Sequence, residues 1–243
     1  MDGFDFDTAP AEFQKVRRVV ETAFIVSGIG WALNYFFTIH KAYQDRMSGV
    51  SLISLSNNLA WELAFALVIR PPNPFTRVIF PLWLSINVFV LYVTVKFERE
   101  SGSHSPFVRR HLPFITSISI LGLLSGHLAF SSHVGSLAAL YWGGMLCQVT
   151  LSASALGLLL QRGHTRGMSY KMWLSRLVAS CFAVPGLFVR AAYWPAKWDW
   201  VNNVLMYWLA GAFYCLDITY GVCFWYFRRL ERSNLGDTRV KQG

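Results

Sequence analysis

Residues 57–74, NNLAWELAFALVIRPPNP, read as the second half of an apolar helix that contains a carboxylate and ends at a run of prolines. The prolines stop the helix because proline lacks a backbone N–H and restricts the residue before it. Glu62 lies inside the apolar part, where a charged side chain in hydrocarbon costs about 2.5–3.5 kcal/mol on insertion scales. The segment therefore predicts a membrane span that keeps an expensive acidic residue.

The whole chain has the composition of a membrane protein. Of its 243 residues, 54% are hydrophobic and 14% are charged, with a mean hydropathy of +0.37, whereas soluble domains carry about 25% charged residues. Apolar runs of about 20 residues, the length that an α-helix needs to cross a bilayer, recur from end to end. We therefore expect an all-α membrane protein, a bundle of seven transmembrane helices. The expected helices cover residues 16–38, 50–69, 75–95, 112–130, 134–160, 172–192 and 201–227.

The expected helices leave only short tails, residues 1–15 and 228–243, so a single domain covers residues 1–243. Fewer Lys and Arg residues fall on the N-terminal side of the spans than on the opposite side. Because cytoplasmic loops carry the excess of Lys and Arg, we expect a lumenal N-terminus and a cytoplasmic C-terminus, in an integral multi-pass protein of the endoplasmic reticulum. The N-terminal side holds Lys15, Arg17, Arg18, Arg70, Arg77, Arg190 and Lys197.

The net charge of +9 does not indicate nucleic-acid binding. The basic residues lie at helix ends and in short loops, where they anchor helices to lipid headgroups, and no basic patch with interleaved aromatics stands outside the spans. The four cysteines fall in apolar stretches without CxxC spacing. With no metal-ligand cluster, no DDxxD motif and no Gly-rich phosphate loop in the sequence, we expect no metal, no cofactor and no nucleic-acid partner.

Two acidic residues, Glu62 and Asp217, lie deep in expected spans, and we expect no Lys or Arg at the same depth. Burial without a counter-charge favours the neutral, protonated acid, which is the form that a general acid needs. Ionisable residues inside a membrane mark functional sites by default. Glu62 and Asp217 are therefore the predicted catalytic residues, with the alternative that both carboxyls only hydrogen-bond neighbouring helices.

Further candidates surround the two acids. Residues three and four apart share a helix face, which places Asn58 beside Glu62 to orient its carboxyl. By the same spacing, Tyr214 and Tyr220 present electron-rich faces beside Asp217, a setting that stabilises a cation. The predicted substrate-binding residues are these and other polar or aromatic residues of the spans: Asn58, Trp61, Phe65, Tyr214, Tyr220, Asn34, Asn87, His127 and Gln148.

Three stretches resemble a known family: the opening MDGFDFDTAP, NNLAWELAFAL around Glu62 and YCLDITYG around Asp217. In these, and in length and helix pattern, the chain is similar to the small integral-membrane terpene cyclases of fungal meroterpenoid and indole-diterpene pathways. The resemblance implies that the family's two essential acidic positions are Glu62 and Asp217. It also implies a prenylated aromatic or polyketide-derived substrate with a terminal epoxide, cyclised without metal or redox cofactor.

The residues and the resemblance predict one mechanism. Glu62 donates its proton to the epoxide oxygen, directly or through water, and a cationic cascade along the folded farnesyl chain follows in a dry aromatic pocket. Asp217 is a second acid, an orienter of Glu62 or the terminal base, and the sequence does not separate these roles. Expected partners are the prenylated epoxide, the lipid bilayer and other membrane-bound enzymes of the pathway.

Two other functions fit the residues. A small seven-helix transporter would use Glu62 and Asp217 as a proton relay, and such folds commonly contain internal repeats, which this sequence does not show. A scaffold for a pathway complex would need a binding surface that the short loops scarcely provide. A transporter predicts uptake by proteoliposomes that dissipates a proton gradient. A scaffold predicts that loss of either carboxyl leaves product formation unchanged.

Overall fold

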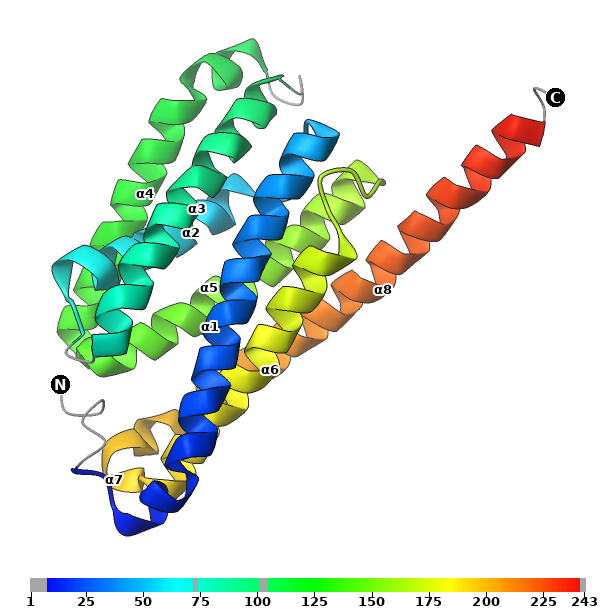
Figure 1. Cartoon of the computed structure of the whole chain (residues 1–243). Helices are drawn as coiled ribbons and strands as arrows, with labels where there is room; N and C mark the ends of the chain where they lie inside the picture. The colour runs from blue at the N-terminus through cyan, green and yellow to red at the C-terminus, as the bar shows by residue number, and fades with distance from the viewer. Residues whose placement is uncertain (1–7, 72–73, 101–104, 241–243) are drawn as a thin grey trace.

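The computed structural model describes residues 8–71, 74–100 and 105–240, and every regular element in these ranges is helical (Figure 1). This confirms the all-α class. The elements are α1 (Ala11–Asp45), α2 (Leu52–Leu63) with the π-helical turn η3 (Ala64–Val68), α3 (Pro74–Glu100), α4 (Pro106–Val134), α5 (Ser136–Arg162), α6 (Tyr170–Tyr193), the short α7 (Pro195–Trp198) with the 3-10 turn η4 (Asp199–Val201), and α8 (Val204–Val240).

The helices run further than the apolar segments predicted. α1 begins at Ala11 and ends at Asp45, and α8 continues to Val240, because polar residues at a membrane surface extend a helix without lengthening its apolar run. α7, which the sequence did not predict, starts with a proline, a residue favoured in the first helical turn. Five described helices, α1, α3, α4, α5 and α6, are long and apolar enough to cross a membrane. The count of seven spans and the orientation stay predictions.

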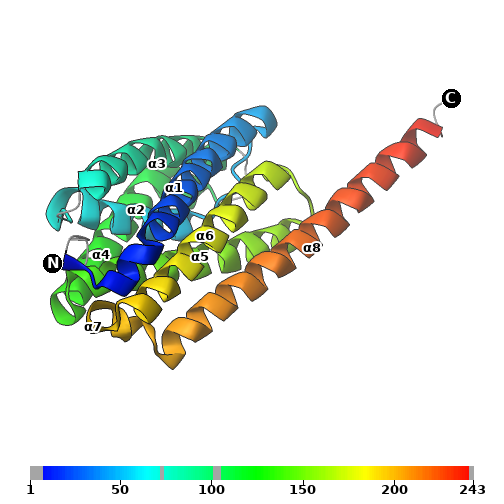
Figure 2. The ribbon, with the colours of Figure 1, turned by 60° about the horizontal axis from the view of Figure 1, so that its bottom comes forward.

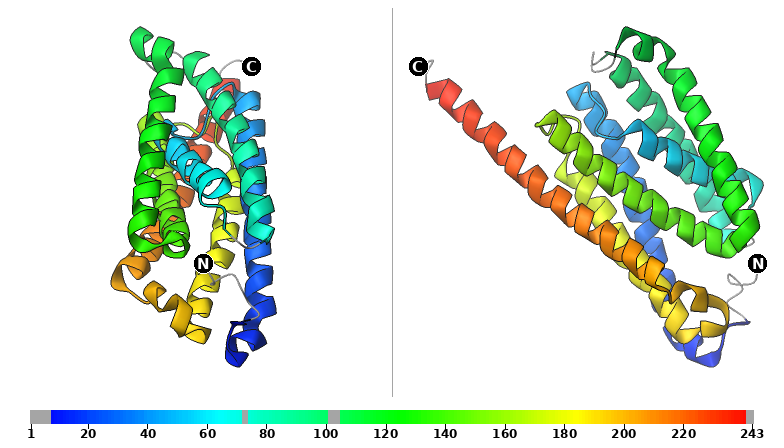
Figure 3. Two further views of the ribbon diagram at one scale, coloured as in Figure 1. Left: turned by 90° about the vertical axis from the view of Figure 1, so that its left-hand side faces the viewer. Right: turned by 180° about the vertical axis from the view of Figure 1, so that it is seen from behind.

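α2 lies at the centre of one half of the bundle. α3, α4 and α5 pack around it, and Figure 3 shows it enclosed between α4 on one side and α3 with α1 on the other. Its last turn widens into η3, where the N–H of Ile69 bonds the carbonyl of Ala64 at 2.8 Å. Such π-helical turns are frequent at functional sites, and this one begins two residues after Glu62.

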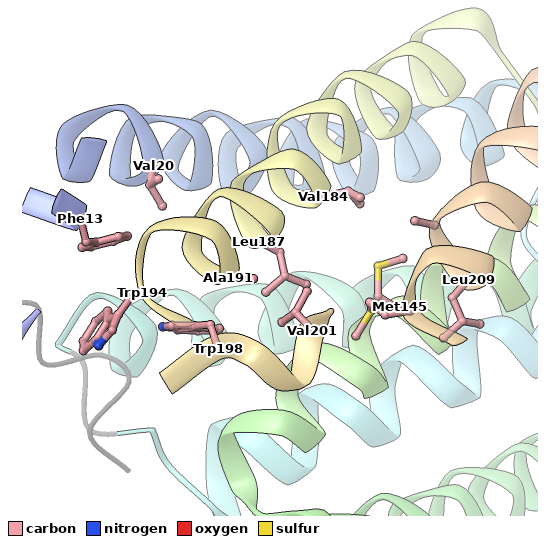
Figure 4. Close-up of a cluster of buried hydrophobic side chains, with 12 residues drawn as sticks. Phe13, Val20, Met145, Val184, Leu187, Ala191, Trp194, Trp198, Val201 and Leu209 are labelled. Carbon is pink, nitrogen blue, oxygen red and sulfur yellow. The ribbon is translucent and has the colours of Figure 1, made fainter. Parts of the chain in front are cut away.

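The other half of the bundle is built from α1, α5, α6 and α8. α6 packs along α1, and α8 packs mainly on α5; Figure 2 shows α8 at the edge of the bundle, with its C-terminal end projecting past the other helices. At the opposite end, α7 closes the bundle against the start of α1. There Trp194 and Trp198 pack with Phe13 in a buried apolar cluster (Figure 4).

The outer surface is apolar, as a lipid-facing surface must be. Large aliphatic and aromatic side chains on several helices point outward, including Val19 at 70% exposed, Phe114 at 66% and Leu121 at 64%. In water such a surface would be an aggregation hazard. In a bilayer it faces lipid tails, while the helical backbone satisfies its own hydrogen bonds.

Two glycines hold a close contact between loops on the side of the bundle where α1 ends. A Cβ on Gly49 would lie 2.2 Å from the carbonyl oxygen of Gly167, and Gly167 has a φ of +79°. The loop before α2 and the loop before α6 therefore touch backbone to backbone. This contact fixes where α2 enters the bundle.

We expect Gly49→Ala to destabilise the protein, because the added methyl group overlaps backbone atoms that cannot move aside. Overpacking of this kind costs about 1–3 kcal/mol. The measurement is the thermal unfolding midpoint of the detergent-solubilised protein. Gly122→Ala is the matched control, since nothing lies within 4 Å of a Cβ at that helical position; equal midpoints for the two variants would contradict the contact.

Candidate active site

Glu62 is fully buried, and three neutral side chains donate hydrogen bonds to its two oxygens. The Tyr35 hydroxyl lies 2.7 Å and the Asn58 amide 3.1 Å from Oε1, and the Asn87 amide lies 3.0 Å from Oε2. The donors come from α1, α2 and α3. The predicted bond from Asn58, one helical turn before Glu62, is confirmed.

A second polar cluster holds the helices behind this carboxyl. Asn57, beside Asn58 on α2, contacts His127 Nε2 of α4 at 3.1 Å and Cys147 Sγ of α5 at 3.5 Å. Trp61 donates its indole N–H to the carbonyl of Leu140 on α5 at 3.0 Å. α2 is therefore tied to each helix around it, so the position of Glu62 is set by side-chain bonds on several sides.

An elongated cavity of about 340 Å³ lies next to this cluster, within the usual range for ligand pockets of about 300–1,000 Å³. Tyr35 and Asn58 line it, but Glu62 does not. Glu21 of α1 lines it too; fourteen residues separate Glu21 from Tyr35, about 21 Å at 1.5 Å per residue. We call the part lined by Tyr35 and Asn58 the acid end of the cavity.

Aromatic side chains form much of the cavity wall. Phe80 lies 5.1 Å from Trp61 and 5.5 Å from Trp83 between ring centroids, and all three line the cavity together with Trp31. Faces of such rings attract a cation, more strongly where water is excluded. The wall can therefore stabilise positive charge that moves along the cavity.

A buried arginine lines the cavity some distance from the acid end. Arg190 of α6 is 4% exposed, and its guanidinium lies 4.1 Å from the ring centroid of Phe24 and 4.9 Å from that of Trp198. It also donates to the hydroxyl of Tyr141. We call this part, lined by Phe24, Tyr141 and Arg190, the arginine end.

Asp217 lies outside the cavity and has a cationic partner. Its Oδ1 accepts hydrogen bonds from Arg176 of α6 and from Ser152 of α5, the latter at 2.9 Å, and the carboxyl is fully buried. The prediction that no Lys or Arg lies at the depth of Asp217 is wrong. Arg176 sits in the second turn of α6, and its long side chain reaches a carboxyl deeper in the bundle.

The remaining predicted substrate-binding residues divide into two groups. Gln148 lines the cavity, as Asn58 and Trp61 do, and Phe65 packs behind Trp61 with a centroid distance of 5.9 Å. The others lie away from the cavity and bind helices to one another. These are Asn34, which donates to the carbonyl of Met172 at 2.6 Å, His127, Tyr214, which donates to the carbonyl of Ser180 at 3.0 Å, and Tyr220, which packs near Arg176.

The sequence did not single out two residues that the structure brings to the cavity, Tyr35 and Arg190. Tyr35 looked like one of many aromatic residues within spans, and Arg190 looked like a headgroup anchor. The only feature of the sequence that could have pointed to either residue is a polar side-chain group within or near an apolar run. Both assignments depend on which helices pack face to face, which a single sequence does not state.

A bundle of apolar helices around an aromatic-walled cavity, with a buried carboxyl behind one end of it, fits a membrane protein that acts on an apolar small molecule. Comparison with known proteins narrows the class. The profile of the Pyr4-like transmembrane terpene cyclases matches residues 4–230. The chain therefore belongs to this family, and the resemblance seen in the sequence is confirmed.

Individual relatives match along nearly their whole length. The chain is 57% identical to the terpene cyclase esdpB of Penicillium shearii, over 96% of this chain and 95% of that protein. It is 52% identical to the terpene cyclase cle7 of Aspergillus versicolor, over 95% and 96% of the two chains. It is 38% identical to the terpene cyclase janB of Penicillium janthinellum, over 97% of each.

Family membership makes this protein a membrane enzyme of terpene cyclisation and gives no support to the transporter alternative. The relatives are fungal and carry the name of an enzyme, which also disfavours a pure scaffold. Most of the opening stretch MDGFDFDTAP, residues 1–7, lies outside the described residues.

We expect Asp217→Asn to destabilise the protein, because it leaves the Arg176 guanidinium buried without its counter-charge. Breaking a buried ion pair in this way costs about 3–5 kcal/mol. Arg176→Met should do similar damage, and the double variant should lose less than the sum of the two. The measurement is the thermal midpoint in detergent for all four proteins; additive losses would show that the two side chains do not act as a pair.

Proposed function

We propose that the protein protonates the terminal epoxide of a farnesylated aromatic or polyketide-derived substrate and so starts a cationic polyene cyclisation in meroterpenoid biosynthesis. One observation carries the proposal: a fully buried carboxyl, Glu62, lies directly behind the acid end of a long aromatic-walled cavity. Membership of a terpene cyclase family supports the reaction class.

The chemistry balances without a metal or a redox cofactor. A proton moves to the epoxide oxygen, the bond from that oxygen to the tertiary carbon breaks, and the oxygen keeps the electron pair as a hydroxyl group. Electrons of the nearest alkene then form a carbon–carbon bond to the cationic carbon, and each ring closure passes the positive charge to the next alkene. Loss of a proton ends the cascade.

Glu62 is the source of the first proton in this proposal. Its three hydrogen-bond partners are neutral, so no fixed cation opposes a proton on the carboxyl, and each can stabilise the carboxylate left after transfer. The aromatic wall of Trp31, Trp61, Phe80 and Trp83 faces the migrating charge. The apolar lining of the cavity also helps to keep water from trapping the cation.

The two ends of the cavity suggest one orientation of the substrate. With the epoxide at the acid end, the aromatic head lies toward the arginine end, where the guanidinium of Arg190 can donate to oxygens of the head. We also propose the endoplasmic reticulum membrane as the location, a lumenal N-terminus, and contact with other membrane-bound enzymes of the pathway. The charge distribution of the chain supports the orientation.

Asp217, in this account, is a positioning residue. It joins α8 to α5 and α6 through Ser152 and Arg176, and α5 and α6 both contribute walls of the cavity, among them Gln148 and Ala183. Its loss would disturb the cavity without removing a group from it. A positioning role fits Asp217 better than that of an acid or terminal base, because neither Asp217 nor its partners Arg176 and Ser152 line the cavity, whereas Glu62 is bonded to two residues that do.

We expect Glu62→Gln to lower cyclisation by about 10²–10⁴-fold, the usual contribution of a general acid, because the amide cannot release a proton. The measurement is product formation by microsomes of a heterologous host supplied with an epoxyfarnesyl aromatic substrate, normalised to protein level. Glu12→Gln, an exposed carboxyl in the first turn of α1, is the control and should keep full activity. Turnover by Glu62→Gln near the level of the control would overturn the proposal.

We expect Ala183→Trp to block both binding and turnover, because the indole would occupy space within the cavity that Ala183 lines. A non-reactive analogue with an alkene in place of the epoxide should raise the thermal midpoint of the wild type and not that of the variant. Val178→Trp is the matched control, since Val178 on the same helix is 46% exposed on the outer surface. Unchanged stabilisation in Ala183→Trp would place the substrate elsewhere.

A further inference from the structure

The proposed acid does not reach the space where the substrate would lie. Glu62 is 0% exposed and does not line the cavity, whereas its partners Tyr35 and Asn58 do. A proton from Glu62 can therefore reach the cavity only by transfer through one of these two side chains, or after one of them moves. An amide such as Asn58 is a poor proton carrier, but a phenol hydroxyl both donates and accepts.

Hydrogen-bond accounting singles out the Tyr35 hydroxyl. Its oxygen lies 2.8 Å from the Asn58 amide nitrogen and 2.7 Å from Glu62 Oε1. The amide nitrogen only donates, so the Tyr35 oxygen accepts that bond. The contact with Glu62 holds one hydrogen, which belongs to Tyr35 when the carboxyl is ionised and to Glu62 when Oε1 is protonated.

The protonated state then fixes the direction of the last hydrogen. With a proton on Oε1, the Tyr35 oxygen accepts from both Glu62 and Asn58, so its own O–H points away from both. The other Glu62 oxygen, Oε2, accepts from the Asn87 amide at 3.0 Å, and Asn87 does not line the cavity, so a path to the substrate starts from Oε1. Because Tyr35 lines the cavity, its hydroxyl is the group of this cluster that can present a proton to a bound substrate.

We propose that Tyr35 is a catalytic residue that hands the proton of Glu62 to the epoxide. The phenol O–H bond breaks as the substrate O–H bond forms, and the Glu62 O–H bond breaks as the phenol regains its proton. The epoxide C–O electron pair stays on the new hydroxyl group, and the negative charge ends on Glu62. This inference rests on the proposed function and deepens it.

The relay explains why three donors converge on a residue that does not touch the substrate. After transfer, Glu62 is a carboxylate that accepts hydrogen bonds from Tyr35, Asn58 and Asn87. All three donors around it then have an acceptor. Tyr35 also separates that carboxylate from the carbocation. A carboxylate in direct contact could attack the cation and form an ester, whereas the neutral phenol stabilises it through its ring.

The test compares Tyr35→Phe with Asn87→Leu, since each removes one hydrogen-bond donor from Glu62 but only Tyr35 lines the cavity. If Tyr35 carries the proton, its variant falls about 10²–10⁴-fold in single-turnover rate, well below Asn87→Leu, while the alkene analogue still raises its thermal midpoint. Equal rates for the two variants would show that Tyr35 only positions Glu62 and would overturn the relay.

A second measurement needs no variant and so does not depend on variant folding. In mixtures of H₂O and D₂O, the wild-type single-turnover rate should curve with the deuterium fraction, because two protons move in one step. A straight line means one proton in flight and contradicts the relay. The relay and the proposed function can fail separately. If Glu62→Gln keeps its turnover, the proposed function is wrong. If Glu62→Gln is inactive but the tests of Tyr35 contradict the relay, Glu62 is still the acid and Tyr35 does not carry its proton.

Discussion

The arrangement of this protein depends on the burial of one carboxyl, that of Glu62, in an apolar interior. An ionised carboxylate there costs about 2.5–3.5 kcal/mol or more, and an unsatisfied buried polar group is costly in either protonation state. Three donors from α1, α2 and α3 offset this cost. Each donor reaches Glu62 only if its helix has the right depth and rotation, so the carboxyl used by the proposed chemistry also fixes the packing around α2.

The two buried acids differ in what surrounds them. Glu62 has neutral donors and lies behind a cavity, while Asp217 has the permanently charged guanidinium of Arg176 and lies away from it. A carboxyl among neutral donors can hold and release a proton during a reaction. A carboxyl paired with a guanidinium serves to hold α5, α6 and α8 together.

Local sequence rules predicted the features that are set within a single helix. The apolar runs marked where α1 to α6 and α8 lie, and the spacing of four residues predicted the bond between Asn58 and Glu62. Contacts between helices were beyond these rules: Tyr35 and Asn87 reach Glu62 across 27 and 25 residues of chain, and Arg176 reaches Asp217 across 41. Such contacts depend on how each helix is rotated and packed. A run that is apolar on all faces does not indicate which face meets which neighbouring helix.

The central claim is that Glu62 holds a proton in the resting enzyme, and infrared spectroscopy of the protein reconstituted in lipid tests it most directly. The difference spectrum between the wild type and Glu62→Gln should contain the carbonyl stretch of a protonated, buried carboxyl. That band should persist in Asp217→Asn. A difference spectrum that contains only the bands of an ionised carboxylate would contradict the account.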